Sequence, residues 1–97
     1  MGGGAGVTGS PPADYDVRLH PTAAREYRRL QGTLRERVRR AIDALGSDPR
    51  PAGTVSLDGR DDYRVRVEDY RVVYAVDDAE RLVIVARIAH RREVYRR

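Results

Sequence analysis

The stretch YRVRVEDYRVVY, residues 63–74, predicts a β-hairpin, because apolar and polar side chains alternate on both sides of the Glu-Asp pair at 68–69. If that pair forms a two-residue loop, Arg66 lies directly opposite Arg71. Cross-strand partners share a face, so Arg64, Arg66 and Arg71 are expected together on one face. A loop one residue longer would move Arg71 to the other face. The loop lacks the glycine that is usual in the tightest turns, so both lengths stay open.

The predicted arginine face has two interpretations. An ordinary solvated sheet face carries charge of either sign, and arginine is the only basic residue other than histidine in this chain. Like charges directly opposite each other destabilise a sheet, so neighbouring carboxylates, solvent or a bound polyanion must offset Arg66 against Arg71. The second interpretation is therefore a surface that binds an anion. The apolar residues of the other face should lie under the helices: Tyr63, Val65, Val67, Tyr70, Val72, Tyr74 and Val76.

A short strand is expected at Tyr15–His20, followed along the chain by two helices and then by the hairpin. Pro21 suits the first position of a helix, and Gly32 interrupts that helix. Thr33 and Glu36 then form a T-x-x-E capping box for a second helix. Its core-facing residues follow helical spacing, and Gly46 ends it. They are Leu34, Val38, Ala41, Ile42 and Leu45.

Three strands are expected in the second half of the chain, at about Tyr63–Val67, Tyr70–Val76 and Leu82–Ala89. The links between them are short, which favours antiparallel neighbours. The order β-α-α-β-β-β predicts an α+β fold with a four-stranded antiparallel sheet and two N-terminal helices packed on one face.

Length and composition favour one small domain that meets an acidic partner. Of the 97 residues, 1–13 form a Gly/Ser/Pro-rich tail that is expected to be disordered, and 14–97 form the folded domain. The net charge is +4 and the pI about 10, which suits nucleic acid or an acidic protein. The chain has no cysteine, no apolar stretch long enough to span a bilayer and no signal-peptide pattern, so a cytoplasmic protein is expected.

The segment IAHRREVYRR, residues 88–97, adds side chains suited to RNA chemistry. His90 can titrate near neutrality, and Tyr95 can stack on a base. Arg91 and Arg92 add positive charge beside them. RNA can be cleaved without metal when cations stabilise the attack of a ribose 2′-OH on its phosphate and two groups move the protons. A solvated basic end with a surface histidine is the alternative interpretation.

Residues 15–95 resemble the RelE/ParE superfamily of bacterial toxin–antitoxin toxins, on the RelE side, through LDGRDDYRVRVEDYRVVY, IAHRREVY and the element order. The resemblance implies a phosphate-binding role for Arg64 and Arg66, at positions where relatives commonly carry lysines, one of them a general base. It implies that Arg71 stabilises the phosphate, that Arg91 assists the leaving group, and that Tyr95 stacks on a base. Arg60 and Arg92 are expected to bind RNA.

One departure from the family pattern concerns the general base. A guanidinium stays protonated at neutral pH and is therefore a poor base. Either His90 is a substitute base, or catalysis relies on electrostatics and on positioning by the ribosome.

The resemblance implies a toxin that enters the ribosomal A site and cleaves mRNA with no metal or cofactor. It also implies a cognate acidic antitoxin, through which the complex would contact operator DNA. Two alternatives stay open: a ParE-like inhibitor of DNA gyrase, and an inactive relative that only binds RNA or its antitoxin.

Overall fold

The computed structural model describes residues 15–51, 54–56 and 62–94. The expected tail at 1–13 lies outside these residues. The elements are β1 (Asp16–Leu19), α1 (Pro21–Arg29), α2 (Gly32–Ala44), β2 (Val55–Ser56), β3 (Asp62–Val67), β4 (Tyr70–Asp77), β5 (Leu82–His90) and α3 (Arg91–Val94). Within the described ranges, no helix has the length and apolar character needed to cross a membrane.

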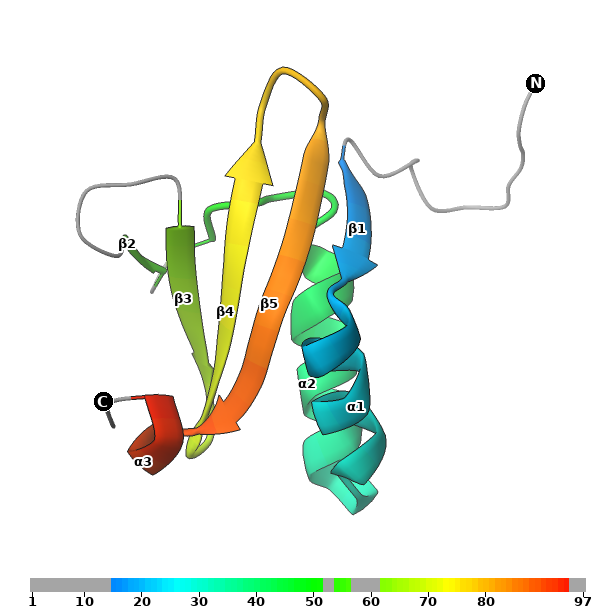
Figure 1. Cartoon of the computed structure of the whole chain (residues 1–97), viewed down its shortest axis with the longest axis vertical. Coiled ribbons are helices and arrows are strands. Elements are labelled where there is room, and N and C mark those ends of the chain that lie inside the picture. Colours follow the sequence, from blue (N-terminus) through cyan, green and yellow to red (C-terminus); the bar gives the residue numbers. More distant parts are fainter. Residues whose placement is uncertain (1–14, 52–53, 57–61, 95–97) are drawn as a thin grey trace.

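The sheet is mixed, with the strand order β1-β5-β4-β3-β2 (Figure 1). The prediction of a four-stranded antiparallel sheet is therefore wrong in two respects. β1 pairs with β5 in parallel, and the two-residue strand β2 adds a fifth strand beside β3. Short links make β3, β4 and β5 antiparallel neighbours. That rule does not reach β1, because both helices and the other strands separate it from β5 along the chain.

The predicted hairpin register is confirmed. Val67 pairs with Tyr70 and Arg66 with Arg71, so Glu68 and Asp69 form a two-residue loop. The loop needs one residue in the left-handed region, and Glu68 takes it with φ 55° although it is not glycine.

The hairpin loop is tied to the second helix. Arg37 of α2 donates from Nη1 to Glu68 Oε2 at 2.9 Å. This exposed ion pair supports the loop by a few tenths of a kcal/mol, up to about 1.

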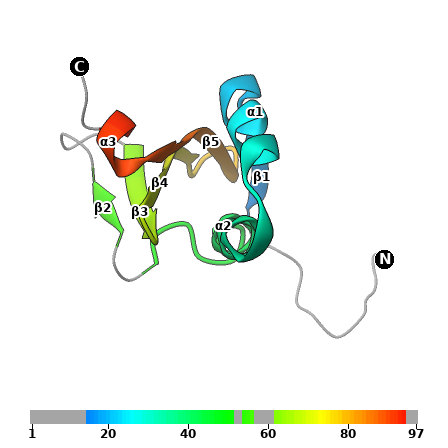
Figure 2. The ribbon, with the colours of Figure 1, turned by 90° about the horizontal axis from the view of Figure 1, so that it is seen from below.

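α2 lies on one side of the sheet, as Figure 2 shows from below, and the core residues are packed between the two. Val38, Ile42 and Leu45 of α2 are buried, as the helical spacing predicted. Val72 and Tyr74 from β4 are buried against the same core, so the predicted apolar face of the hairpin is confirmed. α1 adds Ala23, the residue after it adds Leu30, and α1 lies along β5. The opposite face of the hairpin, which carries the arginines, is not covered by α2.

The start of α1 agrees with the prediction from the sequence, and the start of α2 differs from it. Pro21 opens α1, and the ring Nδ1 of His20 accepts a hydrogen bond from the backbone N–H of Thr22 at 3.2 Å. The predicted Thr33/Glu36 capping box is wrong. α2 begins at Gly32, where φ is +63°, and its N-cap makes no side-chain hydrogen bond.

A β-bulge in β5 changes which side chains share a face. Tyr74 pairs with Val85 and Val73 pairs with Arg87, which leaves Ala86 as the extra residue. Strict alternation would put Arg87 on the core side with Val85. The bulge moves it to the arginine side and turns the next residue, Ile88, into the core.

The edge of β5 beyond the bulge is closed by a side chain of α1. β1 pairs with β5 only as far as Val85. Further along, Oε1 of Glu26 accepts a hydrogen bond from the backbone N–H of Ile88 at 2.7 Å. The carboxylate thus satisfies an edge donor that would otherwise be open to another strand.

Candidate nucleic-acid interface

Four arginines gather on the sheet face opposite α2. The strand register places them in two adjacent cross-strand rows: Arg64–Val73–Arg87 and Arg66–Arg71–Ala89. Partners in a row share a face, so the co-facial arrangement of Arg64, Arg66 and Arg71 is confirmed. We call these three residues together with Arg87 the arginine cluster.

The members of the arginine cluster differ in their access to solvent. Arg66 is exposed, and its Nε donates to the carbonyl of Glu68 at 3.2 Å. Arg64 is partly buried. Arg71 is only 8% exposed, and its Nη1 donates to the carbonyl of Tyr70 at 3.3 Å. Among the described residues, Arg71 is the one charged residue that is buried. A guanidinium in such a place acts on a nearby anion more strongly than one in bulk water.

Arg87 is the functional candidate that sequence reasoning missed. Its side chain is 43% exposed and contacts Glu26 of α1, with Nε to Oε2 at 2.9 Å and Nη2 to the same oxygen at 2.8 Å. A signal was present in the sequence. Unbroken alternation along VIVARIAH puts an arginine in the core and Ile88 in solvent, and this inversion indicates a bulge.

His90 is not brought into the arginine cluster. It pairs with Tyr70, whereas the neighbouring pair on the arginine side is Arg71 with Ala89. The His90 ring contacts the Tyr70 ring edge-on, with 5.6 Å between centroids and 78° between planes. Its Nδ1 accepts a hydrogen bond from the backbone N–H of Arg92 at 3.2 Å. These contacts give His90 a structural role at the junction of β5 and α3.

The short helix α3 carries two of the predicted residues. Arg91 and Arg92 are exposed, and the backbone N–H of Arg91 donates to the carbonyl of Asp69 at 2.7 Å. This bond ties α3 to the hairpin loop. Figure 2 shows α3 on the side of the sheet opposite α2. The predicted residues Arg60 and Tyr95 lie outside the described residues.

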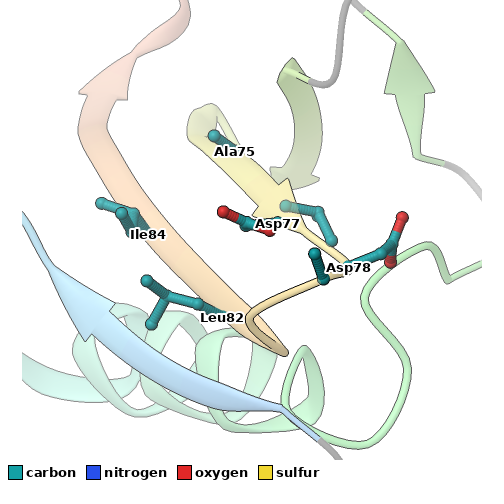
Figure 3. Close-up of a pocket in the computed structure, with 7 residues that line it drawn as sticks. Ala75, Asp77, Asp78, Leu82 and Ile84 are labelled. Carbon is teal, nitrogen blue, oxygen red and sulfur yellow. The ribbon is translucent and has the colours of Figure 1, made fainter.

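The other end of the same face is acidic and apolar. An open hollow of about 560 Å³ lies there, between β4, β5 and their loop (Figure 3). Leu82 and Ile84 line it beside the carboxylates of Asp77 and Asp78. Asp62 pairs with Ala75 in the adjoining row. This hollow is lined by apolar groups and carboxylates, so its chemistry does not suit an anion.

A network of ion pairs and hydrogen bonds around Asp78 stabilises this acidic end of the sheet. Arg50 reaches Asp78 with both terminal nitrogens, at 2.9 and 3.3 Å, and its Nε donates to the hydroxyl of Tyr63 at 3.0 Å. The hydroxyl of Tyr15 donates to Asp78 Oδ1 at 2.5 Å. Hydrogen bonds from Arg50 and then Tyr15 lower the pKa of the Asp78 carboxyl below its ordinary 3.8. The same bond to Asp78 raises the pKa of Tyr15.

The network predicts a loss of stability in acid. Because the pKa of Asp78 is lower in the folded state, its contribution is present above about pH 3.8 and disappears as the pH falls through the folded value. Asp78→Asn is expected to lower the melting temperature at neutral pH. The difference from the parent protein should close below pH 3.8. Melting curves of both proteins across this range measure it, and a constant difference at every pH would contradict the assignment.

Comparison with known proteins identifies the family. Residues 17–95 match the model of a protein family described as "ParE toxin of type II toxin-antitoxin system, parDE". No curated protein sequence gives a match. Among solved structures, a chain of the archaeal RelE–RelB complex from Pyrococcus horikoshii is 25% identical. The match covers 80% of this chain and 96% of that one, with a TM-score of 0.70.

Two further toxin structures share the fold. The isolated Escherichia coli RelE toxin is 30% identical, with 84% of this chain and 90% of that chain covered and a TM-score of 0.63. The RelBE2 toxin–antitoxin complex of Mycobacterium tuberculosis is 25% identical, with coverage of 80% and 92% and a TM-score of 0.66. Because the family match spans most of the domain, the chain belongs to the ParE toxin family of type II toxin–antitoxin systems, within the RelE/ParE superfamily.

Proposed function

We propose that this toxin is a ribosome-dependent mRNA endonuclease that cleaves by attack of a ribose 2′-OH on the adjacent phosphodiester. The observation that carries the proposal is the arginine cluster, in which side chains of β3 and β4 converge on one face and Arg71 is shielded from water. An array of guanidinium groups can bind a phosphate from several directions. The likeness to solved RelE structures supports the same reaction class.

The proposed chemistry needs charge stabilisation more than it needs a strong base. The 2′-oxygen loses its proton to water and forms a bond to phosphorus, while the bond from phosphorus to the 5′-oxygen breaks. The 5′-oxygen takes up a proton from water, so the products are a cyclic phosphate and a 5′-hydroxyl. Negative charge builds on the non-bridging oxygens in the transition state, where Arg64, Arg66 and Arg71 would donate hydrogen bonds. The ribosome orients the reacting groups, which supplies a large part of the rate by proximity. No metal or cofactor takes part.

The remaining predicted residues would surround this centre. Arg91, exposed at the start of α3, would assist departure of the 5′-oxygen, and Arg92 would contact a neighbouring phosphate. Tyr95 would stack on a base, and Arg60 would add a further RNA contact. These four assignments follow the family resemblance.

The position of His90 predicts that it is not the general base. We expect His90→Ala to keep the cleavage rate within about threefold of the parent, since one general base contributes roughly 100-fold or more. Loss of the Tyr70 contact and of the bond to Arg92 should instead lower the melting temperature. Single-turnover cleavage on programmed ribosomes tests this, with Tyr70→Phe as the stability control. A His90→Ala rate that is 100-fold lower in a folded variant would restore the histidine to the mechanism.

The expected partner is an acidic antitoxin. Solved relatives include RelE–RelB complexes. An acidic segment over the arginine cluster would offset the repulsion between Arg66 and Arg71 in the free sheet. The complex would contact operator DNA through the antitoxin, and the toxin itself would act in the cytoplasm, where ribosomes and mRNA are found.

Induction of the toxin in a bacterial host tests the activity directly. Cuts in mRNA that fall within translated codons, with a cyclic phosphate on the upstream fragment, are the expected result. The same induction with translation blocked by an initiation inhibitor should give no cuts. Growth arrest without any mRNA cleavage would reject the proposal.

A ParE-like inhibitor of DNA gyrase is the second candidate, and the family description favours it. Such a protein needs no catalytic residues, so changes in the arginine cluster would leave toxicity intact. Toxicity would then appear as DNA damage rather than as shortened mRNA.

A further inference from the structure

We propose that Arg87 binds a phosphate of the RNA beside the one held by Arg64, Arg66 and Arg71, so that the strand crosses the sheet from β3 over β4 to β5. The inference rests on the proposed function and adds a residue and a direction to it. The family pattern quoted above contains no role for this position.

The register gives Arg87 its place. It lies in one cross-strand row with Val73 and Arg64, and Arg66 and Arg71 lie in the adjacent row on the same face. Strands lie about 4.8 Å apart, so the backbones at Arg64 and Arg87 are roughly 10 Å apart. A long arginine side chain covers much of that distance from each side. The bulge at Ala86 is what brings Arg87 to this face.

The charges on the rest of the face decide the direction. In the direction of the strands, the arginine cluster is followed on this face by Asp62 and then by Asp77, which lies beside the hollow of Figure 3. A polyanion is repelled at that end. Across the strands it meets Arg87, which is 43% exposed. The lower-energy path for a strand of RNA therefore runs across the sheet toward Arg87 and α1.

Glu26 acts as an internal anion at this position. Its Oε2 contacts two guanidinium nitrogens of Arg87, while its Oε1 is fixed by the backbone N–H of Ile88. The carboxylate occupies Arg87 in the free protein, and an incoming phosphate shares or displaces it. Removing the charge of Glu26 should therefore strengthen RNA binding, and this gain should depend on the presence of Arg87.

Salt-dependent binding of a short, labelled, single-stranded RNA oligonucleotide tests the inference. Each phosphate contact on a single strand contributes about 0.7 to the slope of log affinity against log salt concentration. Arg87→Gln is expected to weaken binding several-fold and to reduce the slope by about 0.7. Arg87→Lys, which keeps the charge, should retain the slope. Arg18→Gln is the matched control, because Arg18 pairs with Asp16 at 2.9 Å on the acidic end of the same face. It should leave the slope unchanged.

A double-mutant cycle separates binding from folding. Glu26→Gln keeps an acceptor for Ile88 and should raise RNA affinity in the parent, yet have no effect in the Arg87→Gln background. Melting curves establish that each variant is folded at the assay temperature. An unchanged slope in folded Arg87→Gln, or equal effects of Glu26→Gln in both backgrounds, would reduce Arg87 to a structural ion pair.

Failure of this inference can be distinguished from failure of the proposed function. If the parent cleaves mRNA on ribosomes while Arg87→Gln keeps the parent's slope, the inference is wrong and the function stands. If the parent neither binds the oligonucleotide in a salt-dependent way nor cleaves mRNA, the function fails and the inference fails with it.

Discussion

Replacing Arg71 by methionine is expected to lower the rate of mRNA cleavage by about 100-fold to 1,000-fold, the usual cost of removing one preorganised donor to a developing oxyanion. Arg71 is the most shielded member of the arginine cluster, so solvent weakens its field less than that of Arg66. Methionine is unbranched and flexible, so it can fill much of the space left by the arginine side chain without its charge. The rate is measured in a single-turnover assay on programmed ribosomes.

The same substitution should change the stability of the fold only slightly. Arg66 lies directly opposite Arg71, so removing one of two facing like charges relieves repulsion, while the loss of the bond from Arg71 to the Tyr70 carbonyl acts in the other direction. Arg71→Met is therefore expected to melt within a few degrees of the parent. Arg18→Met, on the acidic end of the face, is the control and should retain full activity. A folded Arg71→Met variant that still arrests growth and cleaves at the parent's rate would remove the cluster from the mechanism.

Truncation of Tyr74 is expected to have the largest effect on stability. Its ring is 1% exposed in the core, and its hydroxyl donates to the carbonyl of Pro49 at 2.7 Å. Tyr74→Ala should cost about 3–5 kcal/mol, as deletion of a buried aromatic ring does. That is a large share of the 5–15 kcal/mol typical of a domain. Tyr74→Phe should cost about 1–3 kcal/mol, because the carbonyl loses its donor.

Denaturant unfolding measures both Tyr74 variants, with the slope of each transition checked for two-state behaviour. Tyr27→Phe removes a hydroxyl from a partly buried ring on α1, and it should change the free energy of unfolding by about 0.5 kcal/mol or less. If Tyr74→Phe were as stable as the parent, the bond to Pro49 would contribute nothing to the fold.

The hairpin was predictable because two strong local rules agree there. Alternation separates Val65 and Val72 from Arg64 and Arg66, and a two-residue loop fixes which residues face each other. The only local signal against this loop was its lack of glycine. Glu68 accepts the left-handed conformation at a cost of roughly 1–2 kcal/mol. Burial of Val72, Tyr74 and Val76 on the other face, with partly buried apolar neighbours packed against the same core, outweighs that strain.

The errors lie where non-local contacts decide. Nothing in Asp16–Leu19 indicates the direction of the partner strand, since β1 and β5 are distant in sequence. The bulge at Ala86 breaks the count along β5, so Arg87 was missed. Nearness in sequence predicts His90 beside the arginines, but the last residue of a strand can face either side. The register with Tyr70 decides the face.

The parallel pair formed by β1 and β5 has a consequence for folding time. It joins Asp16 to Leu82, so the native sheet closes only after contacts form across most of the domain. Such non-local pairing slows folding, since loop-closure entropy is lost before the contacts compensate for it. A ribosome that synthesises this chain exposes β1 and both helices before β5. β1 therefore has no partner strand until β5 has been made, a delay that the order of the strands imposes.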